Sequence, residues 1–122
     1  MRQSTEHRRR TLFQEALAAI ARDFPDENLS LAAVAHSIAT SRRQLQRVFA
    51  EQETSFRTEL QRVRMARAAQ LLRQETLPVA TVARAVGYRQ AAQFSKAFRR
   101  HYGHPPSAAR PGRRERGSAI AA

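Results

Sequence analysis

Two short segments of the chain, residues 42–47 and 89–96, concentrate side chains that can read DNA bases. Arginine donates two hydrogen bonds to guanine, glutamine pairs with adenine, and alanine contacts the thymine methyl group. The first segment is the more cationic, and the second is richer in glutamine and alanine. The candidate base-facing residues are Arg42, Arg43, Gln46 and Arg47 in the first segment, and Arg89, Gln90, Ala92, Gln93 and Lys96 in the second.

Each segment lies in one copy of a pattern that occurs twice. Residues 31–49 read LAAVAHSIATSRRQLQRVF, and residues 79–98 read VATVARAVGYRQAAQFSKAF. The copies are offset by 48 residues in their first half and by 49 in their second half, which indicates one residue inserted near Gln93. A repeat in such a short chain predicts two similar structural units.

The pattern is typical of a helix-turn-helix, in which two short helices pack at a steep angle and the second enters the major groove. Ala35 and Ala83 are small enough to permit close packing, and Ala39 and Gly87 fall in the turn. Apolar side chains at i and i+4 anchor the inner face of each second helix and leave the opposite face outward. These anchors are Leu45 and Phe49 in the first copy and Phe94 and Phe98 in the second.

The chain as a whole predicts an all-α fold of about seven helices, because sustained period-2 alternation is absent. Ser30 and the Ser41–Gln44 capping box mark helix starts, and Pro78 suits a first helical position. Two helix-turn-helix subdomains are joined by a long linker helix. The expected helices cover residues 5–23, 30–37, 41–52, 55–73, 78–87 and 90–102, with a last turn at 107–110.

We divide the chain into residues 1–53, with an N-terminal helix and the first helix-turn-helix (about 31–52); 54–74, the linker helix; 75–110, with the second helix-turn-helix (about 79–102) and a short C-terminal turn; and 111–122, a tail expected to be disordered. A linker of about 19 residues spans about 28 Å. One turn of B-DNA is about 34 Å.

The linker is expected to bury Phe56, Leu60, Val63, Ala66 or Arg67, Leu71 and Leu72.

Net charge points to a polyanionic partner. The chain carries 22 Lys and Arg against 10 Asp and Glu, a formal charge of +12. No apolar run approaches the length of a membrane span, so we expect no membrane partner. Zero cysteines fit a reducing compartment.

Catalytic and metal chemistry is not expected. The chain lacks a Gly-rich phosphate loop, a nucleophile–base set and paired carboxylates facing a plausible cleft. His101 and His104 offer two metal ligands without a third. We therefore predict no catalytic residue, no metal and no cofactor, and we reject an enzyme.

Two basic stretches leave alternatives open. The run Arg8-Arg9-Arg10 either touches phosphate or is a solvated helix start, which we favour by about two to one. The tail arginines Arg113, Arg114 and Arg116 either add nonspecific affinity or do nothing specific. For the whole chain, the alternative to a sequence-specific regulator is a nonspecific nucleic-acid-binding or architectural protein.

Several segments resemble the AraC/XylS family of bacterial transcription regulators over about residues 12–110. They are SRRQLQRVF at 41–49, RMARAAQLL at 64–72, VARAVGY at 82–88, FSKAF at 94–98 and YGHPPSAAR at 102–110. The resemblance implies two recognition helices in adjacent major-groove segments. It also implies transcription control, usually by activation through RNA polymerase, in the cytoplasm at the nucleoid.

Carried over by position, the resemblance implies base contacts from Arg43, Gln46, Arg47, Gln90, Ala92, Gln93 and Lys96. We expect phosphate contacts from Ser41, Arg42, Arg89, Arg99 and Arg100.

Three positions depart from the family pattern. Glu53-Thr54 replaces the usual Gly, Glu59 stands where an aromatic is common, and Arg89 replaces a small capping residue. The chain resembles either a short standalone member that acts as a monomer or the C-terminal domain of a longer regulator.

Overall fold

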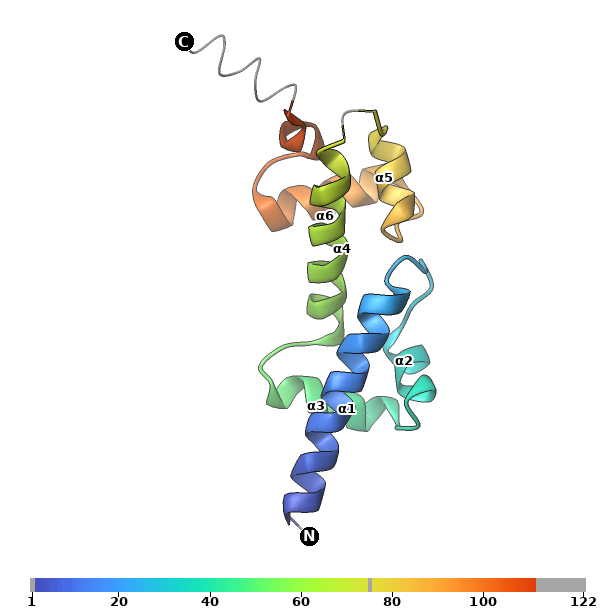
Figure 1. Cartoon of the computed structure of the whole chain (residues 1–122), viewed down its shortest axis with the longest axis vertical. Helices are drawn as coiled ribbons and strands as arrows, with labels where there is room; N and C mark the ends of the chain where they lie inside the picture. The colour runs from blue at the N-terminus through green and yellow to red at the C-terminus, as the bar shows by residue number, and fades with distance from the viewer. Residues whose placement is uncertain (1, 75, 112–122) are drawn as a thin grey trace. The chain divides into compact units, whose positions relative to one another are not determined.

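The computed structural model describes residues 2–74 and 76–111, and this part of the chain contains helices joined by turns and loops, without a strand (Figure 1). The predicted all-α fold is confirmed. The last turn, expected at residues 107–110, is a 3-10 helix, η1, at Pro106–Ala109. The elements are α1 (Arg2–Asp23), α2 (Leu31–Ser37), α3 (Arg42–Glu51), α4 (Phe56–Leu72), α5 (Val79–Ala85), α6 (Ala91–Tyr102) and η1 (Pro106–Ala109).

The chain divides into two compact units, Met1–Val63 and Arg64–Ala122. The boundary falls inside α4, so this helix contributes residues to both units. The predicted tail from residue 112 onward, with Arg113, Arg114 and Arg116, lies outside the described residues.

Unit 1 is built around the packing of α1 on α2 and α3. Leu12, Ala16 and Ile20 recur at i, i+4 and i+8 along α1, and all three are buried. The Phe49 ring of α3 meets the Phe13 ring edge-on, with centroids 5.6 Å apart. Full burial of one such side chain stabilises the fold by about 1.5–3 kcal/mol, so this apolar face accounts for much of the stability of unit 1.

Unit 2 has its own core, centred on two phenylalanines of α6. Phe94 and Phe98 are buried, and their ring centroids lie 5.7 Å apart. The guanidinium of Arg110, beyond η1, donates to the backbone oxygens of Leu77 and Gln74. Arg110 thereby ties the end of the described chain to the connection between α4 and α5.

The buried face of α4 differs in part from the one predicted. Ala66 and Arg67 are exposed, whereas Met65 and Ala68 are fully buried. The prediction was wrong here because it assumed one continuous inner stripe. In unit 1 the helix packs Leu60 into the core, and in unit 2 it buries a second stripe, formed by Met65, Ala68 and Leu72.

The turn after α3 has a left-handed residue that is not glycine. Glu53 has φ 55°, a conformation in which a side chain is strained. Two backbone bonds close the turn, from Glu53 N to Ala50 O at 2.9 Å and from Thr54 N to Phe49 O at 3.1 Å. The positive φ explains why the family uses glycine near this position.

Glu59, the second departure from the family pattern, is buried but satisfied. Its carboxylate accepts a hydrogen bond of 2.5 Å from the Thr54 hydroxyl and one of 3.1 Å from the Arg62 guanidinium. A buried carboxylate with such partners avoids most of the cost of desolvation. The polar pair Thr54–Glu59 therefore replaces aromatic packing at this corner.

The strain at Glu53 predicts a stabilising substitution. Glu53→Gly should raise the free energy of unfolding by about 1 kcal/mol, because glycine adopts positive φ without a Cβ clash. Urea denaturation followed by circular dichroism measures the change. Ala18→Gly is the matched control, since Ala18 is exposed in the middle of α1 and should lower stability by about 1 kcal/mol. Equal signs for the two variants would contradict the strain argument.

Candidate nucleic-acid interface

The same turn joins the two helices of the motif in both units. In unit 1, Thr40 N donates to Ala35 O at 2.9 Å, and in unit 2, Tyr88 N donates to Ala83 O at 2.9 Å. Each turn contains one residue with positive φ, Ala39 at 57° and Gly87 at 95°. Ala35, Ala83 and Gly87 are buried at these junctions. The two predicted helix-turn-helix motifs therefore share one backbone design.

The residue inserted in the second copy is Arg89, not one near Gln93. Tyr88 occupies the place of Thr40 in the turn, and Gln90 occupies the place of Ser41 as the residue before the helix. The offset thus changes from 48 to 49 between the turn and the helix start. Arg89 is an extra, exposed residue at this entrance.

The N-terminus of α3 is capped as its sequence predicts, but only from one side. The Ser41 hydroxyl accepts a 3.0 Å hydrogen bond from Gln44 N. In a capping box the Gln44 side chain would also accept a hydrogen bond from the backbone N–H of Ser41. Here it accepts a 3.0 Å hydrogen bond from the Thr40 hydroxyl instead. The sequence analysis missed the contact of Thr40 with Gln44, since Thr40 lies one residue before the Ser41–Gln44 capping box. Ser30 caps α2 as predicted, accepting from Ala33 N at 3.1 Å.

The α5 and α6 helices begin without a side-chain cap. Pro78 is the N-cap of α5 rather than its first residue, and Gln90 is the N-cap of α6. The amide groups at the N-terminus of α6 are therefore free of a side-chain cap, and helix N-termini of this kind attract phosphate.

Each second helix has one buried side and one exposed side. In α3, Leu45, Val48 and Phe49 are no more than 2% exposed, and in α6 Phe94 and Phe98 are no more than 1% exposed. The residues predicted for base contact all lie on the exposed side or at the N-cap. They are Arg43, Gln46 and Arg47 in α3, and Gln90, Ala92, Gln93 and Lys96 at α6.

The residues predicted for phosphate contact are also exposed. Ser41 and Arg42 stand at the start of α3, Arg89 precedes α6, and Arg99 and Arg100 lie in its last turn. Ser41 and these four arginines flank the residues predicted for base contact along the chain. Such positions suit phosphates on either side of a groove.

Sequence reasoning missed one polar residue on α6. With Arg89 as the insertion, Ser95 is the counterpart of Gln46, as Lys96 is of Arg47. Ser95 is half-buried. The offset of 49 residues, which already pairs the anchors Leu45 and Phe94, is the signal that identifies Ser95, and it is the same for an insertion at Arg89 or near Gln93.

Comparison with known proteins identifies the family. A family model described as a helix-turn-helix domain matches residues 34–111, which include both helix pairs. The chain belongs to the AraC-type helix-turn-helix family. The solved structures that resemble it contain DNA-binding domains of AraC-type transcriptional regulators, so the resemblance to the AraC/XylS family is confirmed.

Solved AraC-type domains have the same fold. The C-terminal domain of AraT, a response regulator from Geobacillus stearothermophilus, is 32% identical with a TM-score of 0.77, covering 80% of this chain and 82% of that one. A Chromobacterium violaceum regulator with an AraC-type DNA-binding domain is 28% identical with a TM-score of 0.75, covering 82% and 89%.

Among curated relatives, the RCS-specific HTH-type transcriptional activator RclR of Escherichia coli is 40% identical over 77 residues. This match covers 63% of the present chain and 26% of RclR. The chain spans between 19% and 26% of the length of the curated relatives it matches.

Two further residues, Tyr88 and Arg64, pack against each other. Tyr88 follows the turn and packs edge-on to Phe94, with ring centroids 5.6 Å apart, and the Arg64 guanidinium lies 5.6 Å from the centre of the Tyr88 ring. Arg64 was missed as a packing residue because an arginine on a linker reads as solvated. Such a cation over an aromatic face stabilises by about 0.5–2 kcal/mol.

The histidines of the AraC-type domain's closing segment belong to an aromatic cluster. The His104 ring stacks on Tyr102 with an interplanar angle of 17° and lies 5.8 Å from Phe98. Within residues 2–74 and 76–111, no three His, Asp or Glu residues gather closely enough to hold a metal ion. In the same part of the chain, no helix is both long and apolar enough to cross a membrane.

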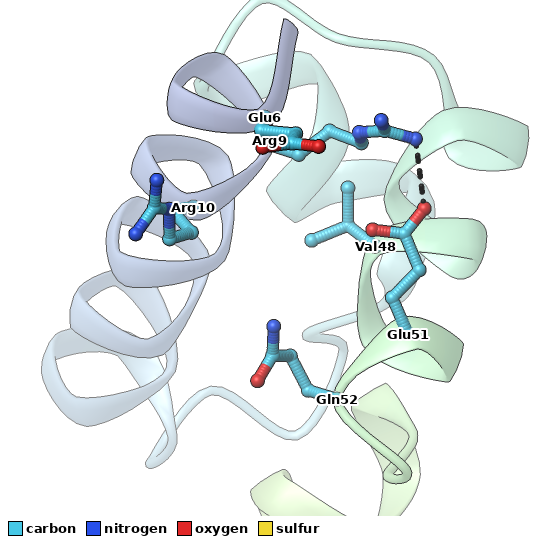
Figure 2. A pocket seen from close by; sticks show the side chains of 6 residues that line it. All are labelled: Glu6, Arg9, Arg10, Val48, Glu51 and Gln52. Carbon is cyan, nitrogen blue, oxygen red and sulfur yellow. Dashed lines mark hydrogen bonds and ion pairs between the residues drawn. The ribbon is translucent and has the colours of Figure 1, made fainter. Parts of the chain in front are cut away.

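Of the three arginines near the start of α1, one has a defined partner. Arg9 Nη1 lies 3.0 Å from Glu51 Oε1 at the end of α3 (Figure 2). Arg8 and Arg10 are exposed. The interpretation of this run as a solvated helix start thus omits one contact, from Arg9 to α3.

Proposed function

We propose that the chain binds double-stranded DNA sequence-specifically as a monomer and regulates transcription. In this proposal α3 and α6, with their flanking residues (about 42–52 and 90–102), enter adjacent major-groove segments of one asymmetric site. The observation that carries it is the division of each helix into a fully buried side and an exposed side of base-reading residue types. Such a helix can approach base edges without disturbing its own core.

The residue types assign the roles. Arg43, Gln46 and Arg47 read one half-site, and Gln90, Ala92, Gln93 and Lys96 read the other. Phosphate contacts come from Ser41, Arg42, Arg89, Arg99 and Arg100. Because the exposed side of α3 is arginine-rich and that of α6 carries a single lysine among its base-facing residues, the two half-sites differ in sequence.

The regulatory partner we propose is RNA polymerase. The E. coli relative is named a transcriptional activator. A protein with this role acts on chromosomal DNA, at the nucleoid in the cytoplasm. We assign the chain no enzymatic activity.

The net charge of +12 favours one rival, a nonspecific nucleic-acid-binding or architectural protein. Such a protein ignores sequence, and its affinity falls steeply with salt. The two proposals differ in the ratio of specific to nonspecific affinity at one salt concentration.

Selection of bound sites from a random duplex pool, followed by affinity measurements, tests the proposal. We expect an asymmetric site bound at least about 10³-fold more tightly than a scrambled duplex at the same salt. A ratio below about ten would support the nonspecific rival, and a palindromic site would contradict the asymmetric reading.

Removal of a base-reading side chain should relax specificity. Gln46→Ala or Arg47→Ala is expected to cost about 1–3 kcal/mol on the selected site and to reduce preference at one or two base pairs. Competition binding with single-base variants of the site measures this. Arg57→Ala is the control, since Arg57 is an exposed arginine on α4 outside both recognition helices. Undiminished discrimination in Arg47→Ala and Gln46→Ala would refute the assignment.

The repeat within one chain replaces the two-fold symmetry of dimeric helix-turn-helix proteins. Sedimentation of the free protein should therefore give a single species near 13.8 kDa, and the complex with the selected site should contain one protein per duplex. A stable dimer would overturn the monomer proposal.

A further inference from the structure

Glu51 places a negative charge beside a residue proposed to read DNA. It lies four residues after Arg47 on α3, and residues at i and i+4 are neighbours on a helix surface. A carboxylate also opposes the helix dipole at a C-terminus. An unrestrained Glu51 can therefore pair with the Arg47 guanidinium and compete with the DNA for it.

The structure shows Glu51 directed to a different cation. Its Oε1 atom lies 3.0 Å from Nη1 of Arg9 on α1, and both side chains line the hollow drawn in Figure 2. Within the described part of the chain, Arg47 forms no ion pair and is exposed. The hollow has a volume of about 350 Å³, and its other lining residues are Glu6, Arg10, Val48 and Gln52.

The Arg9–Glu51 contact is held by packing around it. Leu12 and Phe13, one turn further along α1, are packed in the core of unit 1, and Phe13 meets Phe49 of α3 edge-on. Val48, between Arg47 and Phe49, is buried. The backbones that carry Arg9 and Glu51 are therefore fixed relative to each other within this unit.

We propose that Arg9 is a positioning residue for DNA recognition: it holds the Glu51 carboxylate on the α1 side of α3 and so leaves the Arg47 guanidinium free to reach its base. The inference rests on the proposed function, since it takes Arg47 as a base-reading residue. In this role Arg9 acts through Glu51 and does not itself contact DNA.

The expected effect is moderate. The side chains of Arg9 and Glu51 are 33% and 39% exposed, so water screens both the existing pair and its competitor. Ion pairs at such sites shift an equilibrium by about two- to five-fold. The release of Glu51 should weaken DNA binding by a factor in this range.

A double-substitution cycle with the full chain and the selected duplex tests the proposal. Arg9→Ala should weaken binding about three-fold and reduce preference at the same base pair that Arg47→Ala affects. In a Glu51→Gln background, Arg9→Ala should change affinity by less than about 1.5-fold, because the competing charge is gone. In an Arg47→Ala background, Arg9→Ala should likewise leave the affinity for the duplex nearly unchanged.

Two controls separate this role from simpler ones. Arg8→Ala removes the same charge from an exposed neighbouring position, and it should leave base preference unchanged. Arg9→Lys keeps a cation near Glu51 and should restore most of the affinity lost in Arg9→Ala. A purely structural role for Arg9 would lower the melting temperature without altering preference at the Arg47 base pair.

The opposing result is an equal loss from Arg9→Ala in all three backgrounds, with a salt dependence reduced by about one phosphate contact. That outcome would make Arg9 a direct phosphate ligand and overturn the positioning role. Failure of the proposed function looks different, because the unsubstituted chain would then show no preferred duplex on which to run the cycle.

Discussion

The structure depends on the complete burial of one side of α3 and of α6, the second helix of each pair. In α3 this side carries Leu45, Val48 and Phe49, and Phe49 is the hub, because its ring meets both Phe13 and Phe56 edge-on. A helix whose inner face is held so firmly has a fixed rotation about its axis. The rotation decides which residues face outward, and it leaves Arg43, Gln46 and Arg47 no alternative to solvent or a ligand.

Close packing at the turn follows from the same constraint. The first helix of each pair must approach its partner at short range, so a small residue is required at Ala35 and Ala83, and the chain must reverse within a few residues. Reversal needs a left-handed residue, which unit 2 supplies with Gly87 and unit 1 with Ala39. An alanine in that conformation costs about 1–2 kcal/mol relative to an unstrained position. Unit 1 therefore bears strain at Ala39 and again at Glu53.

Periodicity in the sequence predicted most of the core, because Leu45, Phe49, Phe94 and Phe98 repeat at the spacing of a helix and their burial needs no knowledge of distant residues. It failed on α4, where one helix serves two cores and Met65 and Ala68 lie off the stripe that Phe56 and Leu60 begin. The place of the insertion was wrong for a related reason. Sequence similarity weighs residue types, whereas the hydrogen bonds of Tyr88 and Gln90 show where the backbone gains Arg89. Contacts between residues far apart in the chain, such as Arg9–Glu51 and Arg110 with Leu77, carry no local signal at all.

The two units thus keep the same backbone and differ in the charges around it. α3 concentrates arginines, and it also ends in Glu51 and is followed by Glu53, so its cationic face lies next to anionic groups. The last turn of α6 instead contains the basic residues Arg99, Arg100 and His101. Positive charges at the C-terminus of a helix interact favourably with the helix dipole. The two copies of the repeat share their core positions but not their charged residues. Glu51 and the arginines of α3 are therefore kept apart by a contact from outside the helix pair. The long α1, which unit 2 lacks, provides such a contact in unit 1. In unit 1, α1 therefore covers the core and, through Arg9, also holds one carboxylate at the end of α3.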